Sequence, residues 1–236
     1  MKFTSLALAA TLMFAASAQA NESVIRKALS QQFPGASISS VQKTPYSGLF
    51  EVYLDGQLVY VDAKAQYVFA GDVIDLKTRT NLTQARLNQL QAVKWDTFPL
   101  ANALKTVKGN GARKLILFSD VDCPYCRRFE AELAKVDNIT VYTFLYPIEG
   151  LHPKAPQTSK QIWCAPDRNK AWDDYISNGS VPKNDGKCAN PVDSNIALGN
   201  KLKVSGTPTL FFPNGQRVPG MVPAAQLEKL LAANAK

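Results

Sequence analysis

Two cysteines separated by two residues, Cys123 and Cys126, lie at a boundary between two different sequence patterns. The apolar run over residues 114–119 has the composition of a buried strand. After the motif, Phe129 and Leu133 recur at the spacing of the buried face of a helix. This feature constrains the fold more than any other, because it predicts a thiol pair at the corner where a strand passes into a helix.

A cysteine at the start of a helix faces unpaired backbone N–H groups and the positive end of the helix dipole, which both favour its thiolate. Thiols in such motifs have pKa values of roughly 3.5–7.5 instead of about 8.5. We therefore expect Cys123 to be the catalytic nucleophile and Cys126, one turn into the helix, to be the resolving thiol. Pro124 and Tyr125, which separate them, are expected to tune the pair. A redox pair at such a corner is typical of thioredoxin-like domains.

The first 20 residues have the pattern of a secretory signal peptide. A basic Lys2 precedes an apolar run over residues 6–16, and Ala18-Gln19-Ala20 resembles a cleavage site. The alternative is a membrane anchor, but the run is shorter than the about 20 residues that a span needs. We expect cleavage after Ala20 and export of a soluble chain into an oxidising compartment, where disulfides persist.

The charged residues argue against a nucleic-acid partner. The chain carries 27 basic and 19 acidic residues, a net charge of +8, but no run of five or more basic residues. Charge that is spread along the sequence in this way favours a solvated surface. We therefore expect no nucleic-acid binding.

Residues 21–80 predict a small α+β domain. A short helical face at its start is followed by β-like runs, and Asp55-Gly56 between two of them is a hairpin signal. About 60 residues form only a marginal core on their own, and an open strand edge offers a surface for association. We expect this domain to form a homodimer. An amphipathic pattern after it predicts a linker helix over residues 81–98.

Residues 99–236 predict a second α+β domain, in which a strand, the thiol corner, a helix and another strand follow one another. This order predicts a parallel strand pair with a right-handed crossover. The strand pattern then lapses, and Pro and Gly separate three helical signals, which predicts a helical insertion over about 149–203. The other expected elements are a short helix over 100–107, strands over 207–212 and 216–218, and a last helix over 223–232.

Thr207-Pro208 directly precedes an apolar run. A cis proline beside a cysteine pair would leave backbone groups of the preceding residue free to pair with an extended substrate. Only about 5–6% of X–Pro bonds are cis, and a trans proline at the start of a strand is common. The cysteine motif upstream shifts this preference toward cis.

Cys164 and Cys188 are 24 positions apart and lack the short spacing of a redox motif. We expect them to form a structural disulfide that closes the loop of the helical insertion. The alternative is a zinc site that uses all four cysteines, but zinc sites usually contain two closely spaced pairs. We expect no metal and no other cofactor.

Three polar residues near the cysteine motif have several possible roles. His152, the only histidine of the chain, lies in an expected loop, and we assign it no catalytic role. Asp120 and Asp122 could tune a thiol or relay a proton, and either could equally cap the helix that begins beside them.

Further motifs are distributed over the whole chain after residue 20. They include GDVID at Gly71–Asp75, RTNLT at Arg79–Thr83, GLHP at Gly150–Pro153, GTPT at Gly206–Thr209 and FPNG at Phe212–Gly215. Together with the Cys-x-x-Cys motif, they resemble the DsbC family of bacterial periplasmic thiol:disulfide interchange proteins.

The resemblance implies a homodimer that forms through the N-terminal domain, with a linker helix and a thioredoxin-fold catalytic domain. It implies that Cys123 and Cys126 are the active pair, that Thr207-Pro208 is a cis-proline loop, and that Cys164–Cys188 is a structural bridge. The partners that it implies are misfolded exported proteins with disulfides and a membrane reductant resembling DsbD.

One residue departs from the best-known members of this family, which have Gly where this chain has Pro124. Proline removes an N–H group that could stabilise a thiolate, and the related DsbG proteins resemble this chain in having Cys-Pro-Tyr-Cys. The second cysteine pair and the N-terminal motifs nevertheless resemble DsbC more closely, and we expect a disulfide isomerase that also acts as a chaperone. A DsbG-like reductase of oxidised single cysteines and a thiol oxidase are the alternatives.

Overall fold

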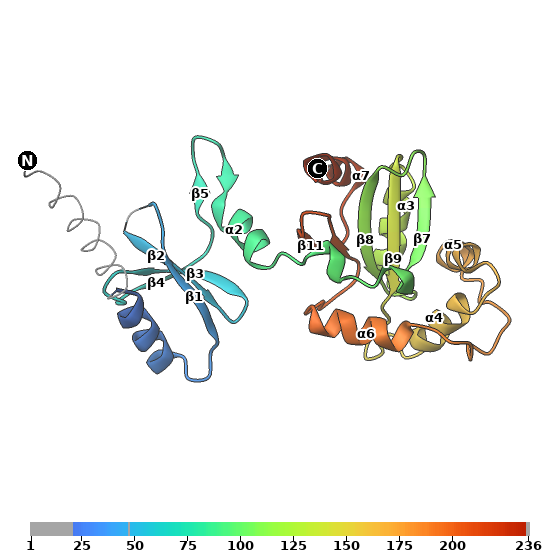
Figure 1. Ribbon diagram of the computed structural model, residues 1–236, viewed down its shortest axis with the longest axis horizontal. Coiled ribbons are helices and arrows are strands. Elements are labelled where there is room, and N and C mark those ends of the chain that lie inside the picture. The colour runs from blue at the N-terminus through green and yellow to red at the C-terminus, as the bar shows by residue number, and fades with distance from the viewer. Residues whose placement is uncertain (1–20, 47, 235–236) are drawn as a thin grey trace, which may run out of the picture. The chain divides into compact units, whose positions relative to one another are not determined.

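The computed structural model describes residues 21–46 and 48–234, so the predicted signal peptide lies outside the described residues. The chain divides into two compact units, one that ends at Leu87 and one that begins at Asn88 (Figure 1). Within the described ranges, no helix is long and apolar enough to cross a membrane.

The N-terminal unit is a helix packed on an antiparallel sheet. The helix covers residues 21–32, and the strands β1 (Ile38–Lys43), β2 (Leu49–Leu54), β3 (Gln57–Asp62) and β4 (Val68–Ala70) are hydrogen-bonded in that order. Asp55 and Gly56 join β2 to β3 with positive φ angles of 48° and 85°, as a type I′ hairpin turn requires. The core of this unit contains Ile25, Leu29, Val41, Phe50, Val52, Val59 and Val61.

A two-stranded ribbon, β5 (Ile74–Asp75) and β6 (Thr80–Asn81), leads into α2 (Leu82–Leu90). The helix predicted over residues 81–98 is thus shorter than expected, and a 3₁₀ turn, η1 (Trp95–Thr97), follows it. Tertiary contacts of the residues after α2 account for the shorter helix. The N–H of Val93 donates to Gly215 O at 3.1 Å, and the ring of Trp95 packs on Phe98.

The prediction of a short helix over residues 100–107 is wrong. The structure has a 3₁₀ turn, η2 (Leu100–Asn102), and then an edge strand, β7 (Leu104–Lys108), which pairs antiparallel with β9 (Ile139–Leu145). Apolar residues at helical spacing led to the wrong prediction. Hydrogen bonding to a neighbouring strand outweighed this local pattern.

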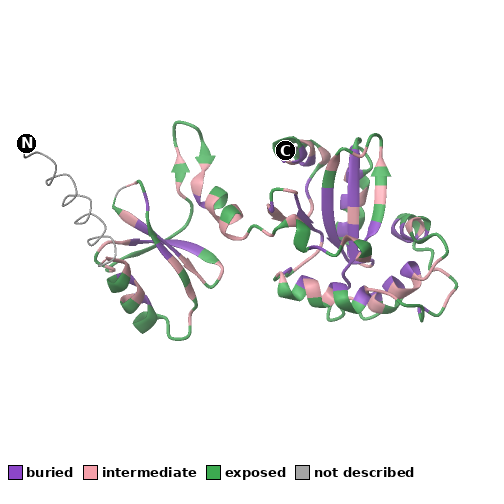
Figure 2. Ribbon diagram, in the orientation of Figure 1, coloured by how far each residue is buried: buried purple, intermediate pink, exposed green. Residues whose placement is uncertain are grey.

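The C-terminal unit contains a five-stranded sheet in the order β11-β10-β8-β9-β7. Strands β8 (Arg113–Ser119) and β9 are parallel and joined through α3 (Pro124–Leu133), whereas β7, β10 (Thr209–Phe211) and β11 (Arg217–Pro219) pair antiparallel. The predicted α+β class and the thioredoxin-like order of elements are confirmed. As Figure 2 shows, the central strands are the most deeply buried part of this unit.

Alternate residues of β8 face opposite sides of the sheet, and both sides are covered. Leu115 and Leu117 pack with α3 and with α7 (Ala224–Ala233) in one apolar core. Ile116 and Phe118 belong to a second core on the other side, which is rich in aromatic rings. The central strand, whose end carries the thiol corner, is therefore fixed from both faces.

Three helices lie between β9 and β10, namely α4 (Ala155–Trp163), α5 (Arg168–Asn178) and α6 (Val192–Lys201). Apolar residues of α4 and α5 share a core with Val121, which lies in the thiol corner itself. This inserted segment therefore packs directly against the site of the cysteine motif.

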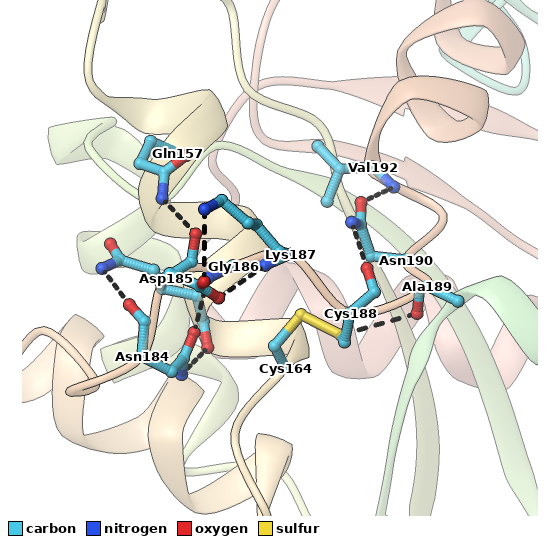
Figure 3. Close-up of a disulfide and its surroundings, with 11 residues drawn as sticks. Gln157, Cys164, Asn184, Asp185, Gly186, Lys187, Cys188, Ala189, Asn190 and Val192 are labelled. Atoms are coloured by element: carbon cyan, nitrogen blue, oxygen red, sulfur yellow. Dashed lines mark hydrogen bonds and ion pairs between the residues drawn. A yellow bond between two sulfur atoms is a disulfide. The ribbon is translucent and has the colours of Figure 1, made fainter.

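A disulfide joins Cys164 at the end of α4 to Cys188 in the loop before α6, with a Cα–Cα distance of 5.7 Å (Figure 3). Gln157 of α4 also holds this loop, because its side-chain amide donates to Asp185 O at 3.0 Å. Gly186 has a φ of 68°, and a Cβ there would lie 3.0 Å from the Cβ of Lys160. The loop thus approaches α4 closely, at a position where a glycine is needed.

Candidate active site

Cys123 is the N-cap residue of α3, with an extended backbone at φ −72° and ψ 121°. Its carbonyl accepts from the N–H groups of Cys126 and Arg127, at 3.1 and 3.2 Å, and its own N–H donates to Asp120 O. Pro124 occupies the first turn of the helix, where the missing N–H costs nothing in helical hydrogen bonding. This geometry holds the side chain of Cys123 at the N-terminal end of the helix.

Both cysteines of the motif are free thiols, and they are buried to different degrees. Cys123 is 5% exposed, whereas Cys126 is completely buried. The Sγ of Cys123 lies 3.4 Å from the carbonyl oxygen of Thr207, to which the thiol donates when it is protonated. The Thr207–Pro208 peptide bond is cis. The structure thus brings the N-terminus of α3 and the loop before β10 together.

The two thiols have opposite pKa shifts. A hydrogen bond from the Cys126 thiol to the sulfur of Cys123 lowers the pKa of Cys123 to about 5, and N–H groups of the helix N-terminus contribute, although burial opposes them. The same hydrogen bond, together with burial, raises the pKa of Cys126 well above its ordinary value. At neutral pH Cys123 is therefore the thiolate and Cys126 remains protonated.

Asp120 lies beneath this corner, and its side chain is completely buried. Its carboxylate accepts three hydrogen bonds, from the N–H of Asp122 at 2.9 Å, the N–H of Ile148 at 2.7 Å and Nδ1 of His152 at 2.9 Å. The structure therefore places His152 in the surroundings of the cysteine motif, although sequence reasoning assigned it no role. No local signal could have found this contact, because 32 residues separate the two side chains.

Asp122 is held by α5. Its Oδ1 accepts from the hydroxyl of Tyr175 at 2.5 Å. The guanidinium of Arg127 lies 5.7 Å from the centre of the Tyr175 ring, at the distance of a cation–π contact. Tyr175 was not among the residues singled out from the sequence. Both aspartates that flank the corner therefore accept hydrogen bonds from the segment between β9 and β10.

Tyr125 is the exposed member of the motif, with 56% of its surface accessible. The guanidinium of Arg128 lies 5.5 Å from the centre of its ring. An aromatic ring that is apolar on its faces and exposed beside a nucleophile offers a contact surface for a substrate chain.

The four cysteines do not converge on one site, since Cys164 and Cys188 form their own disulfide. Among residues 21–46 and 48–234, no three His, Cys, Asp or Glu side chains are grouped so that they could hold a metal ion. The chemistry available at the corner is that of its two free thiols.

Two protein-family models match this chain. A model described as the disulfide bond isomerase protein N-terminal domain matches residues 16–84, and one described as a thioredoxin-like domain matches residues 100–235. A probable thiol:disulfide interchange protein DsbC of Bordetella pertussis is 42% identical over 207 residues, which cover 88% of this chain and 73% of the relative.

Two further comparisons agree. The thiol:disulfide interchange protein DsbC of Escherichia coli (strain K12) is 30% identical over 242 residues, which cover 100% of this chain and 96% of the relative. A crystal structure of a disulfide interchange protein from Neisseria gonorrhoeae is similar with a TM-score of 0.57 and 45% identity, over 59% of this chain and 99% of that chain. The chain therefore belongs to the DsbC family of thiol:disulfide interchange proteins.

Proposed function

We propose that this chain is a disulfide isomerase in which Cys123 attacks the disulfides of misfolded exported proteins. One observation carries the proposal. Cys123 has a lowered pKa and a sulfur beside the cis Thr207–Pro208 peptide, while Cys126 is buried with a raised pKa. A nucleophile and a resolving thiol need this asymmetry.

The reaction begins when the Cys123 thiolate attacks one sulfur of a substrate disulfide. A new S–S bond forms between Cys123 and the substrate, the substrate S–S bond breaks, and the second substrate sulfur leaves as a thiolate that takes up a proton. Another substrate thiolate can then attack the mixed disulfide, which forms a different substrate disulfide and releases Cys123. This sequence changes the pairing of the substrate cysteines without net oxidation or reduction.

Cys126 provides the other exit from the mixed disulfide. If it loses its proton and attacks Cys123, the substrate leaves reduced and the Cys123–Cys126 disulfide forms. Burial still disfavours the thiolate of Cys126 when Cys123 carries a substrate. This supports rearrangement ahead of reduction. A membrane reductant resembling DsbD would return an oxidised pair to its thiols.

Substrate contacts would come from both sides of the nucleophile. The exposed ring of Tyr125 offers apolar area on one side, and the cis Thr207–Pro208 loop offers backbone groups on the other. Neither surface selects a particular side chain, which suits an enzyme that acts on many misfolded proteins. We propose Pro124 and Tyr125 as the residues that tune the pair.

The N-terminal unit would form a homodimer through its open sheet edge. Strand β4 is the last strand of its sheet and, among the residues that the structure describes, pairs only with β3. Tyr67, Val68 and Phe69 on and beside it are 67%, 45% and 51% exposed. An edge strand with exposed apolar side chains is suited to pairing with a second copy. We propose residues 21–80 as the dimerisation domain, with chaperone activity arising from the paired chains.

The proposed location is the periplasm, reached through cleavage of a signal peptide after Ala20. The pattern of the first 20 residues and membership of the DsbC family support it. The structural disulfide between Cys164 and Cys188 suits the same oxidising compartment.

One residue favours a second candidate. Pro124 gives the motif the form Cys-Pro-Tyr-Cys, as in the DsbG-like reductases of oxidised single cysteines. Such an enzyme would reduce a sulfenic acid on a substrate cysteine faster than it rearranges a substrate with several disulfides. A thiol oxidase, in contrast, would be found with Cys123 and Cys126 oxidised in the cell.

The test is refolding of a scrambled protein with several non-native disulfides by the reduced chain in a glutathione buffer. The isomerase proposal expects a native yield above that of the buffer alone. A yield equal to that of the buffer, with rapid reduction of a model sulfenic acid, would replace it with the reductase.

A further inference from the structure

The loop after β9 is fastened to the base of the thiol corner through one buried carboxylate. Asp120 is completely buried, and one of its oxygens, Oδ2, accepts from both the N–H of Ile148 and the ring of His152. The other oxygen, Oδ1, accepts from the N–H of Asp122. The backbone carbonyl of Asp120 also accepts from the N–H of Cys123 at 3.2 Å, so Asp120 connects the loop of His152 to Cys123.

The hydrogen bond of 2.9 Å between Nδ1 of His152 and Asp120 holds the ring beneath the corner. The imidazolium form of His152, in which both ring nitrogens carry protons, can donate to the Asp120 carboxylate here. The His152 side chain is 23% exposed, so the ring is partly accessible to water. Hydrogen bonding to Asp120 raises the pKa of His152, while burial opposes this shift.

The charged groups that face His152 come from the corner itself. They are Asp120, Cys123 and Asp122, and each of them favours the imidazolium form. Asp122 is itself engaged by the Tyr175 hydroxyl, beside which Arg127 lies. A positive charge on His152 is therefore attracted by the Cys123 thiolate, and the same attraction favours the thiolate form of Cys123.

We propose that His152 is a positioning residue whose imidazolium, held by Asp120, offsets the buried negative charge beneath the corner and thereby favours the Cys123 thiolate. This inference rests on the proposed role of Cys123 as the nucleophile. Without the imidazolium, the Asp120 carboxylate would oppose ionisation of Cys123. His152 acts on the sulfur through its charge.

The chain offers a test that needs no substitution of His152, because it contains only one histidine. In the untagged protein, one set of imidazole NMR signals reports the pKa of His152. Since the pKa of Cys123 is about 5, Cys123 is ionised throughout the titration of His152 in the reduced form. The proposal expects the pKa of His152 to be higher by about half a unit to one unit in the reduced form than in the Cys123–Cys126 disulfide form.

Variants separate the charge from the hydrogen bond. His152→Asn keeps an N–H donor for Asp120 without the charge, and it should raise the pKa of Cys123 by about half a unit to one unit. At pH values well below the Cys123 pKa of about 5, the rate constant for alkylation then falls roughly three- to tenfold. The control is Lys154→Gln, which removes an exposed positive charge from the same loop and should leave the Cys123 pKa unchanged.

Two results would overturn the proposal. One is equal pKa values for His152 in the reduced and disulfide forms. The other is an unchanged Cys123 pKa in a folded His152→Asn protein. The pKa values of His152 and Cys123 are both measured by equilibrium titration, which does not depend on isomerase activity. The isomerase proposal can therefore fail in the refolding test while this inference stands. Equally, this inference can fail while the refolding test succeeds.

Discussion

The sulfur of Cys123 lies 3.4 Å from the carbonyl oxygen of Thr207, a residue 84 positions further along the chain. The contact joins the N-terminus of α3 to the cis Thr207–Pro208 peptide. One side of the thiol therefore faces helix N–H groups, which favour its ionisation, and the other faces a loop with backbone groups suited to an extended chain. In the proposed function, the same sulfur would combine reactivity with substrate contact.

Alkylation of the reduced protein should follow the ionisation of Cys123. Its rate constant with iodoacetamide is expected to rise with pH and reach half its plateau near pH 5, because the pKa of Cys123 is lowered to about 5. Cys126 should stay unmodified at neutral pH, since it is buried with a raised pKa. Mass spectrometry of the alkylated peptide identifies the site. A midpoint near 9.0, the pKa from which that of Cys123 is lowered, would contradict this expectation.

Glu130 of α3 should make the protein less stable as pH rises. Burial raises its pKa to about 7 from an ordinary 4.5, the charge of Asp173 adds to this, and its Oε1 has no hydrogen-bond partner among the described residues. The folded state thus binds more protons between pH 4.5 and 7, so the free energy of unfolding falls as pH increases through that window.

The substitution Glu130→Gln removes this dependence. Urea unfolding should show an increase of at most about 3 kcal/mol at pH 8 and little change at pH 5. Glu149→Gln, which alters an exposed carboxyl after β9, is the control and should change neither value. A Glu130→Gln protein that is destabilised equally at both pH values would show that the carboxylate is needed for packing instead.

Removing the second cysteine pair should cost stability and leave the thiol chemistry intact. The Cys164–Cys188 disulfide closes a loop with a sequence separation of 24, which corresponds to about 3 kcal/mol in the chain-entropy account. The variant with both cysteines changed to Ala should therefore lose about this amount in chemical unfolding. Its Cys123 alkylation profile should match that of the unchanged protein, and a shifted profile would mean that the loop supports the corner.

A single substitution on β4 tests the dimer proposal. Phe69→Glu places a charge on a side chain that is 51% exposed at the open sheet edge. Sedimentation should change from dimer to monomer, while the Cys123 pKa stays the same because β4 belongs to the other unit. Thr78→Glu, on an exposed turn, is the matched control. A Phe69→Glu protein that remains dimeric would place the interface elsewhere.

Local patterns were sufficient to predict the thiol corner and the two-unit organisation. A buried strand, two cysteines and an amphipathic helix are adjacent in sequence, so the order of β8, Cys123 and α3 could be predicted from local patterns. The hairpin at Asp55-Gly56 is also local, because a two-residue turn determines its own register.

Long-range contacts account for what the sequence did not reveal. The strand β7 has residues at helical spacing, and only pairing with β9 makes it a strand. His152 meets Asp120, and Tyr175 meets Asp122, across 32 and 53 residues. Nothing near these residues in the sequence indicates their partners, because packing of the inserted helices against the corner creates both contacts.

The most direct test of the central claim compares two variants in refolding of a scrambled substrate with several disulfides. If Cys123 carries the exchange, reduced Cys126→Ala should still raise the native yield above that of the glutathione buffer, although loss of the Cys126 hydrogen bond raises the pKa of Cys123. Cys123→Ala should give the yield of the buffer alone. Equal yields for Cys123→Ala and the unchanged protein, or no gain from any of the three proteins, would contradict the assignment of Cys123 as the isomerase nucleophile.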